Sequence, residues 1–246
     1  MTVMHSVPGI ALFPLISRRE ANWFVVLPAL PIFKQLVLHA QEGRTAVVDY
    51  TLSPSGEGKF TYAQLLDDVA KFRDELASFL GRRDLKGERV AFLVESGYNY
   101  VVTLFTIWAL GGFAVPLCTT HPVHEMLYTV TDSDSVVLLA SHHFEGKIRE
   151  LADEVAKVSD EKRVLFVIPH RAPCIVNTIP QLEESPIAAP MRHALMIYTS
   201  GTTGKPKVRY RCGVRSNRRA LFPHTKQLKR KSCRLSNSGK SRQMTE

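Results

Sequence analysis

The sequence is poor in cysteine, and its cysteines form no recognisable metal or disulfide pattern. Four are present in 246 residues, and no two have CxxC spacing: Cys118, Cys174, Cys212 and Cys233. This usage disfavours a disulfide scaffold and a zinc ribbon, and it predicts free thiols in a reducing compartment. The adjacent residues His142 and His143 have no neighbouring cysteine or acid pair to complete a metal site, so they predict a polar turn.

A long apolar run is also missing. The most apolar stretch, residues 21–33, is interrupted by Pro28 and Pro31 and is too short to cross a lipid bilayer. Charged residues just before it interrupt any signal-peptide core. Two interpretations of residues 1–29 remain, a loosely packed extension or a mitochondrial presequence. The expected location is therefore cytoplasmic or mitochondrial, and the folded body is expected to begin at Leu30.

Two common catalytic motifs are absent. No Gly-x-Ser-x-Gly elbow occurs, which disfavours a serine hydrolase. No Walker phosphate loop occurs either, although residues 199–207 are rich in the same residue types. Only two residues separate Gly201 from Gly204, and Pro206 rather than serine or threonine follows Lys205. A P-loop nucleotide hydrolase is therefore disfavoured.

Acidic residues are nearly absent after residue 207. Residues 208–246 contain 12 lysines and arginines and one acid, a net charge of +11, whereas the first 207 residues carry 20 bases and 22 acids. Clustered bases bind nucleic acid or acidic membrane surfaces, so one hypothesis is a non-enzymatic protein whose tail makes that contact. Against this alternative, the charges follow no helical stripe, and Tyr210 and Phe222 do not interleave with them as stacking platforms.

Strand-like and helix-like segments alternate along the rest of the chain. Thr61 and Gln64 form a capping box, apolar residues then recur at helical spacing, and Gly81 closes this helix. Further helices are expected at residues 98–110, 123–131 and 144–157, and strands at residues 89–94, 113–117, 136–140, 163–168 and 194–198. Strands separated by helices predict right-handed crossovers. The expected fold is therefore α/β, a mostly parallel sheet with helices on both faces.

Two further expectations concern the first half of the chain. Residues 53–58 are rich in serine, glycine and proline, which predicts a surface hairpin between residues 46–48 and Phe60. The helix that begins after Thr61 also carries several acids among its bases, which is typical of a solvated face. The four acids are Asp67, Asp68, Asp74 and Glu75.

The most informative segment is the loop at residues 199–207, which follows the apolar run at 194–198. Gly201 and Gly204 allow backbone amides to approach an anion closely. Hydroxyl groups add further donors, and two lysines add positive charge. The predicted phosphate-binding residues are Thr199, Ser200, Gly201, Thr202, Thr203, Gly204 and Lys207. A loop of this kind at the carboxyl end of a strand is where α/β sheets place their ligands.

These residues, together with Tyr198, resemble the phosphate loop of the adenylate-forming superfamily, which includes acyl-CoA synthetases, firefly luciferases and peptide-synthetase adenylation domains. Segments at residues 60–65, 87–93 and 108–117 resemble successive landmarks of that family in the same order. The stretch between Gly111 and Ser141 is most similar to the malonyl-CoA synthetase branch. The resemblance covers residues 30–207 and implies a truncated fold, the N-terminal part of the large domain.

The resemblance implies an ATP-dependent ligase that joins a carboxylic acid, malonate in that branch, to coenzyme A. The acid would attack the α-phosphate of ATP to give an acyl-adenylate, and the thiol of coenzyme A would then displace AMP. The loop, with Mg²⁺, would neutralise charge on the leaving pyrophosphate. By position in the motif, Lys207 matches the regular lysine of the family and Lys205 a variable one. The implied partners are the acid, ATP and coenzyme A, with no specific nucleic acid and no transmembrane segment.

The sequence departs from the family directly after Lys207, where a glycine and an apolar strand are expected and a basic segment follows. We expect a frameshift or retained intron at this point, and a disordered tail at residues 208–246. The expected organisation is thus an extension at 1–29, a partial synthetase domain at 30–207 and the tail. The catalytic residues of the family lie beyond the departure, so these 246 residues alone are expected to be inactive.

Overall fold

The structure is built around a six-stranded sheet in the order β10-β9-β5-β4-β6-β7. The computed structural model describes residues 26–51, 58–159, 163–168, 179–184, 193–199 and 207–212. Five strands of this sheet run parallel, and β10 pairs antiparallel with β9 at one edge. The strands are β4 (Arg89–Leu93), β5 (Phe113–Pro116), β6 (Val137–Ser141), β7 (Val164–Ile168), β9 (His193–Thr199) and β10 (Lys207–Cys212).

Helices connect the parallel strands, as the alternating pattern predicts. None of the helices in the described part of the chain is long and apolar enough to cross a membrane. The helices are α1 (Pro31–Gln41), α2 (Tyr62–Leu80), α3 (Tyr98–Ala109), α4 (Val123–Ser133) and α5 (Glu145–Val158), and the 3-10 turn η1 (His142–Phe144) precedes α5. The expected turn at His142 and His143 is thus η1.

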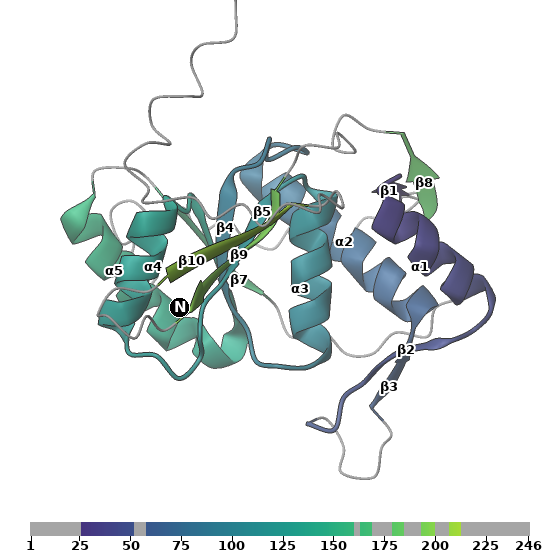
Figure 1. Cartoon of the computed structure of the whole chain (residues 1–246), viewed down its shortest axis with the longest axis horizontal. Helices are drawn as coiled ribbons and strands as arrows, with labels where there is room; N and C mark the ends of the chain where they lie inside the picture. The colour runs from purple at the N-terminus through teal and green to yellow at the C-terminus, as the bar shows by residue number, and fades with distance from the viewer. Residues whose placement is uncertain are drawn as a thin grey trace, which may run out of the picture. The chain divides into compact units, whose positions relative to one another are not determined.

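Both faces of the sheet are covered by helices, which confirms the predicted fold class. Successive residues of a strand point to opposite faces, so β4 divides its apolar side chains between two cores. Val90 and Phe92 pack with α1, α2 and α3, whereas Ala91 and Leu93 pack with α4 and α5. Figure 1 shows α4 and α5 on one side of the strands and α2 and α3 on the other. A central strand buried on both faces is typical of a parallel sheet.

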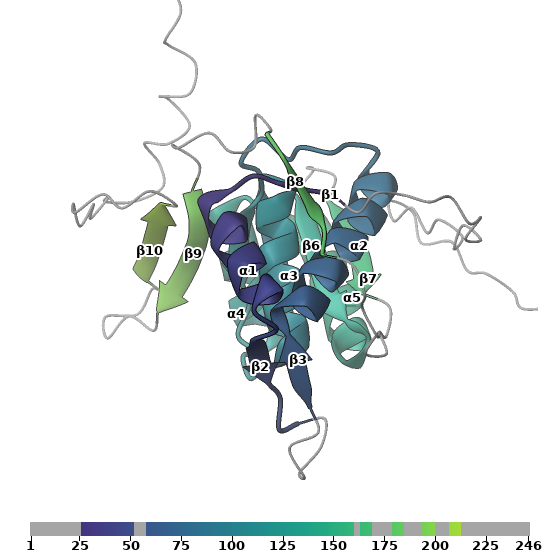
Figure 2. The same ribbon diagram turned by 90° about the vertical axis from the view of Figure 1, so that its right-hand side faces the viewer.

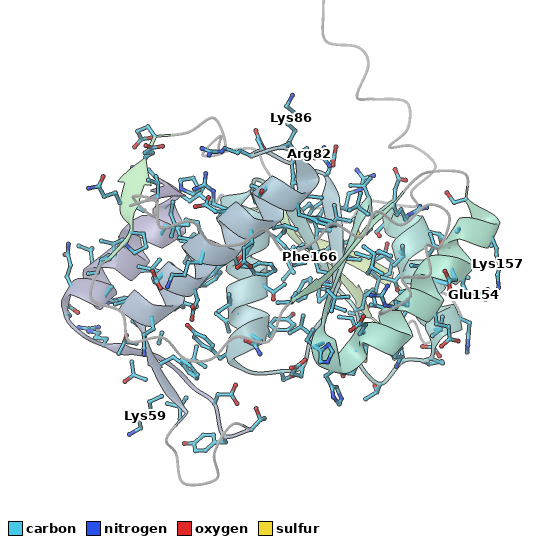
Figure 3. The ribbon with its side chains drawn as sticks, turned by 180° about the vertical axis from the view of Figure 1, so that it is seen from behind. Lys59, Arg82, Lys86, Glu154, Lys157 and Phe166 are labelled. Atoms are coloured by element: carbon cyan, nitrogen blue, oxygen red, sulfur yellow. The ribbon has the colours of Figure 1, made fainter. Side chains whose placement is uncertain are left out.

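Helix α2 begins and ends where the local sequence predicts. Thr61 accepts a hydrogen bond from the Gln64 amide, and the Gln64 side chain accepts one from the Thr61 amide, so the capping box is complete. Gly81 ends the helix with a left-handed φ of 67°, a conformation that glycine adopts without the strain of a side chain. One face of α2 packs on the sheet: Phe72 and Phe79 contact the half-buried Phe166 of β7, which is labelled in Figure 3.

The first helical turn of α3 is capped by a side chain from far away in the sequence. Its own N-cap residue is Gly97, which has no side chain to offer. The Asp49 carboxylate instead accepts a hydrogen bond of 2.8 Å from the Tyr98 amide. Tyr98 is itself buried, with its ring stacked on Phe60 at 3.6 Å between centroids. Through these contacts, Asp49 and Phe60 fix the first turn of α3 to the segment that precedes α2.

The acids of α2 correct one expectation. Asp67 and Asp68 are only 6% and 7% exposed, so these two residues are not on a solvated face. Each carboxylate has a partner: the Lys71 Nζ lies 2.5 Å from Asp67, and the Tyr98 hydroxyl donates to Asp68 at 2.7 Å. The sequence pattern missed this burial because α2 packs against both α1 and α3, which covers more of its surface than a single apolar stripe implies.

In the described part of the chain, two small sheets accompany the large one. The predicted hairpin is present as β2 (Thr45–Val48) and β3 (Lys59–Thr61), which pair antiparallel. The other sheet joins β1 (Val26–Pro28) in parallel to β8 (Gln181–Glu183). Leu27 of β1 is fully buried. The boundary expected at residue 29 is therefore too late, because Val26–Pro28 gains a partner strand that no local signal could reveal.

The start of the expected tail is ordered as a strand. Val208 and the four residues after it belong to β10, whose backbone pairs with β9 over the whole strand. The expectation of disorder from residue 208 is therefore wrong for residues 208–212. The open edge of β9 offers backbone hydrogen bonds that do not depend on which side chains the pairing segment carries. Residues 213–246 lie outside the described part of the chain.

Candidate functional site

The candidate site lies at the carboxyl edge of the parallel sheet. Since β4, β5, β6 and β9 are parallel, the residues after Leu93, Pro116, Ser141 and Thr199 emerge at the same edge. This is the edge at which open α/β sheets bind ligands. The predicted phosphate-binding loop begins here, at the end of β9.

The two ends of that loop are placed by strand pairing. Thr199 is the last residue of β9 and is exposed, and Lys207 is the first residue of β10 and lies opposite Thr199 in the antiparallel pair. Figure 2 shows β9 and β10 side by side. The predicted residues between them, Ser200, Gly201, Thr202, Thr203 and Gly204, lie outside the described residues. Two of the seven predicted site residues are thus placed, and strand pairing brings them together.

A carboxylate and a hydroxyl meet at the centre of this edge. Glu95, two residues after β4, accepts a short hydrogen bond from the Ser141 hydroxyl at the end of β6. Ser141 is 6% exposed and Glu95 is half-buried. The hydrogen bond ties together the ends of two adjacent parallel strands. Neither residue was predicted as a site residue, because their strands are separated by α3, β5 and α4 in the sequence.

The connection between β5 and α4 adds a thiol, a lysine contact and an ion pair. The Cys118 thiol is exposed and lies 3.2 Å from the Thr120 hydroxyl. Lys147 of α5 donates to the Thr119 carbonyl at 2.9 Å, which holds this connection against the neighbouring helix. His121 lies 3.2 Å from the Glu125 carboxylate, so this histidine faces α4.

The pKa of Cys118 is lowered, chiefly by the hydrogen bond from the Thr120 hydroxyl and further by backbone amides of Thr120 and His121. A lower pKa increases the fraction of reactive thiolate at neutral pH. We expect iodoacetamide at pH 7.5 to alkylate Cys118 faster than a cysteine in an unstructured peptide, and Thr120→Val to slow the reaction several-fold. Peptide-resolved mass spectrometry measures the rate, with Thr119→Val as the matched control. Equal rates in wild type and Thr120→Val would contradict the assignment.

Two other features of this edge have partners within the chain. The N-terminus of α3, a position that attracts anions, is occupied by the Asp49 carboxylate. His142 lies 3.0 Å from Glu145, which also binds Arg149, and the Arg149 hydrogen bond is the main cause of the lowered pKa of Glu145. Among the described residues, no three His, Cys, Asp or Glu side chains gather as metal ligands.

A basic cluster lies at the opposite, amino edge of the sheet. Arg82 and Lys86 belong to the connection between α2 and β4, and Figure 3 shows both at the surface. Arg82 is hydrogen-bonded to Glu88 at 2.8 Å. These cations therefore do not contribute to the carboxyl edge.

Comparison with known proteins identifies the family of this chain. Residues 35–208 match the family model described as AMP-binding enzyme, a match that includes the whole predicted loop. A CoA ligase from Gibberella moniliformis (strain M3125 / FGSC 7600) is 34% identical over 177 residues, which are 71% of this chain and 28% of that protein. A mitochondrial malonate–CoA ligase from Homo sapiens is 31% identical over 182 residues, 72% of this chain and 29% of that protein.

Solved structures show the same fold. The N-terminal domain of FACL13 from Mycobacterium tuberculosis superimposes with a TM-score of 0.52 at 22% identity, covering 74% of this chain and 44% of that one. Apo MatB from Rhodopseudomonas palustris gives a TM-score of 0.52 at 21% identity, over 74% of this chain and 34% of that one. The chain spans less than a third of the length of the two curated relatives described above. Because the family model matches well over half of its residues, the chain belongs to the AMP-binding enzyme family.

Proposed function

We propose that this chain is the N-terminal part of an ATP-dependent carboxylic acid–CoA ligase, and that the loop between β9 and β10 binds the phosphates of ATP. The observation that carries the proposal is the pairing of Thr199 with Lys207 at the carboxyl edge of the parallel sheet. That pairing places both ends of the loop at the edge of the sheet where α/β folds bind nucleotides. The relatives named as CoA ligases support the same reaction class.

The chemistry of the loop follows from its composition. Two glycines, several hydroxyls and the Lys207 ammonium present donors to a polyphosphate, and charge-assisted hydrogen bonds of this kind are about twice as strong as neutral ones. Donors that are already in place stabilise the negative charge that develops as pyrophosphate leaves. The proposed contribution of Thr199, Ser200, Gly201, Thr202, Thr203, Gly204 and Lys207 is this electrostatic one.

The proposed substrates are ATP, coenzyme A and a carboxylic acid, with malonate as the preferred acid because a malonate–CoA ligase is among the relatives. Mg²⁺ would accompany the ATP phosphates, as it usually does in such sites. The described residues do not themselves form a metal cluster, so the proposed steps rest on the loop donors alone. No observation on the described residues favours the alternative of a basic protein that binds nucleic acid or membrane.

Binding of inorganic tripolyphosphate to the 246-residue chain tests the phosphate site. We expect isothermal titration calorimetry to detect binding in wild type and a loss of about tenfold or more in affinity in Lys207→Ala, because a hydrogen bond to a charged group contributes about 1.5–3 kcal/mol. Lys205→Ala is the matched control, since it removes the same charge from the same loop at the variable position. Absence of tripolyphosphate binding, or equal losses in the two variants, would contradict the proposal.

A further inference from the structure

Among the described residues, the end of β9 that leads into the loop pairs with β10 on one side but with no parallel strand on the other. Strand β4 pairs with β5 and with β6 at four positions each, and β6 pairs with β7 at five. The pairing of β5 with β9 is limited to Ala114 and Leu195 among the described residues. The four residues from Met196 to Thr199 therefore extend beyond the paired part of β5, with β10 as their strand neighbour. On the side away from β10, contacts with other elements therefore help to set the position of Thr199.

Tyr198, the residue just before Thr199, makes two contacts with α4. Its hydroxyl donates to the Asp132 carboxylate at 2.8 Å. Its ring meets the Tyr128 ring edge to face, with 6.4 Å between centroids and an interplanar angle of 89°. Tyr128 and Asp132 are four residues apart on α4 and so lie on one face of the helix, one turn from each other. One helical face thus holds the side chain of Tyr198 at both its ring and its hydroxyl.

Helix α4 is in turn fixed to the centre of the sheet. Met126 and Val130 are buried in the core that includes Ala91 and Leu93 of β4. At the carboxyl end of the helix, Arg89 of β4 donates to the Ser133 carbonyl at 2.7 Å and to the Asp134 carboxylate at 2.6 Å. Asp132 is therefore attached to a helix that cannot shift without disturbing the central strand.

We propose that Asp132 is a positioning residue for the loop between β9 and β10. Acting through the Tyr198 hydroxyl, its carboxylate connects the end of β9 to α4 and thereby helps to set the place at which the loop leaves the sheet. The role in phosphate binding rests on the proposed function, whereas the role in holding β9 does not. The hydrogen bond between Tyr198 and Asp132 is charge-assisted and half-buried, and such a bond is strong enough to hold the end of β9 against α4.

Hydrogen exchange of the backbone amides in the 246-residue chain tests the holding role without any ligand. We expect Asp132→Ala and Tyr198→Phe each to speed exchange in residues 196–199 and 207–209 by about tenfold, the factor that corresponds to 1.4 kcal/mol. Exchange in β4 and β6 should not change. Because both residues act through one hydrogen bond, the double variant should exchange little faster than either single variant.

Two controls match these changes in chemistry. Asp153→Ala removes a carboxylate from an exposed position on α5, and Tyr50→Phe removes a hydroxyl from a tyrosine that is 70% exposed. Asp132→Asn keeps an acceptor for the Tyr198 hydroxyl and should restore most of the protection that Asp132→Ala loses. Tyr198→Phe leaves the ring in place, so a role in packing alone predicts no change in that variant. Unchanged exchange at residues 196–199 in both Asp132→Ala and Tyr198→Phe would overturn the proposal.

A second readout separates this inference from the proposed function. If the loop binds tripolyphosphate, Asp132→Ala should weaken that binding several-fold, although Asp132 would contribute no donor to the ligand. If the two variants exchange faster than wild type as expected, but wild type does not bind tripolyphosphate, the phosphate site is refuted and the holding role is still supported. Binding in wild type that Asp132→Ala leaves unchanged would refute the positioning of the loop.

Discussion

Replacing Gly97 by alanine is expected to remove a large part of the folding stability of this protein. Gly97 has a φ of 141°, a backbone conformation that costs residues with a side chain about 1–3 kcal/mol. A Cβ atom at this position would lie 2.3 Å from the Asp49 Oδ2 atom, well inside contact distance. Relief requires the Asp49 carboxylate to move, which would break its hydrogen bond to the Tyr98 amide.

The size of the effect follows from the burial of Asp49. This carboxylate is 6% exposed, and a buried charged group that loses a hydrogen-bond partner costs about 1–3 kcal/mol or more. Together with the backbone strain, the expected loss is about 3–5 kcal/mol, against total stabilities of about 5–15 kcal/mol for natural domains. Urea unfolding followed by far-ultraviolet circular dichroism measures it.

Two other glycines serve as controls for this prediction. Gly43 also has a positive φ, 65°, but beyond its chain neighbours no atom lies within 4 Å of the place that a Cβ would take, so Gly43→Ala should show the backbone cost alone. Gly146 lies within α5 in open space, and Gly146→Ala should raise stability by up to about 1 kcal/mol. Equal stabilities for Gly97→Ala and Gly43→Ala would show that Asp49 is not held against Gly97.

The second large effect concerns catalysis: the 246 residues alone are expected to show no ATP–pyrophosphate exchange above background with any acid. A hydrogen-bond donor held in place near the developing charge, as proposed here, raises the rate of a reaction by about 10²–10³-fold. Enzymes as a whole accelerate reactions by about 10⁶–10¹⁷-fold. Much of the difference comes from holding both reactants in a productive geometry. The chain spans 28% of the length of the Gibberella CoA ligase, so most residues of that relative have no counterpart here.

Exchange of radiolabelled pyrophosphate into ATP measures this activity with a panel of acids that includes malonate. The full-length human malonate–CoA ligase, assayed at the same concentration, is the positive control. Tripolyphosphate binding by the same preparation shows whether the chain is folded and its loop competent. Exchange above background in the isolated chain would contradict this prediction.

Elements with strong local signals could be predicted from the sequence. Helix α2 has local sequence signals at both ends, the capping box at Thr61 and the left-handed Gly81. Both lie where the sequence predicts them. The buried strands β4 and β6 are short apolar runs between helices, a pattern that indicates a parallel sheet. The order of these elements was therefore sufficient to predict the fold class.

Features that depend on contacts between distant segments could not be predicted. Helix α1 begins at Pro31 without a side-chain cap, so no start signal marks it beyond the proline itself. The burial of Asp67 and Asp68 depends on how α1 and α3 cover α2, which periodicity does not encode.

The candidate site also has one part that could be predicted from the sequence and one part that could not. The start of the loop at the carboxyl edge follows from the apolar strand that ends at Thr199, and this was predictable. The hydrogen bonds of Ser141 with Glu95 and of Tyr198 with Asp132 join residues that are 46 and 66 positions apart. Only the three-dimensional structure shows such pairs, because each side chain taken alone is an ordinary polar residue.

The pairing of β1 with β8 has a consequence for biosynthesis. Val26 leaves the ribosome about 150 residues before its partner Gln181, a delay of roughly 8–30 s at typical rates of translation. During that interval Leu27, which is fully buried in the finished structure, has no strand beside it. The nascent segment around Leu27 is therefore a place where chaperones that recognise apolar peptides would bind until β8 has been made.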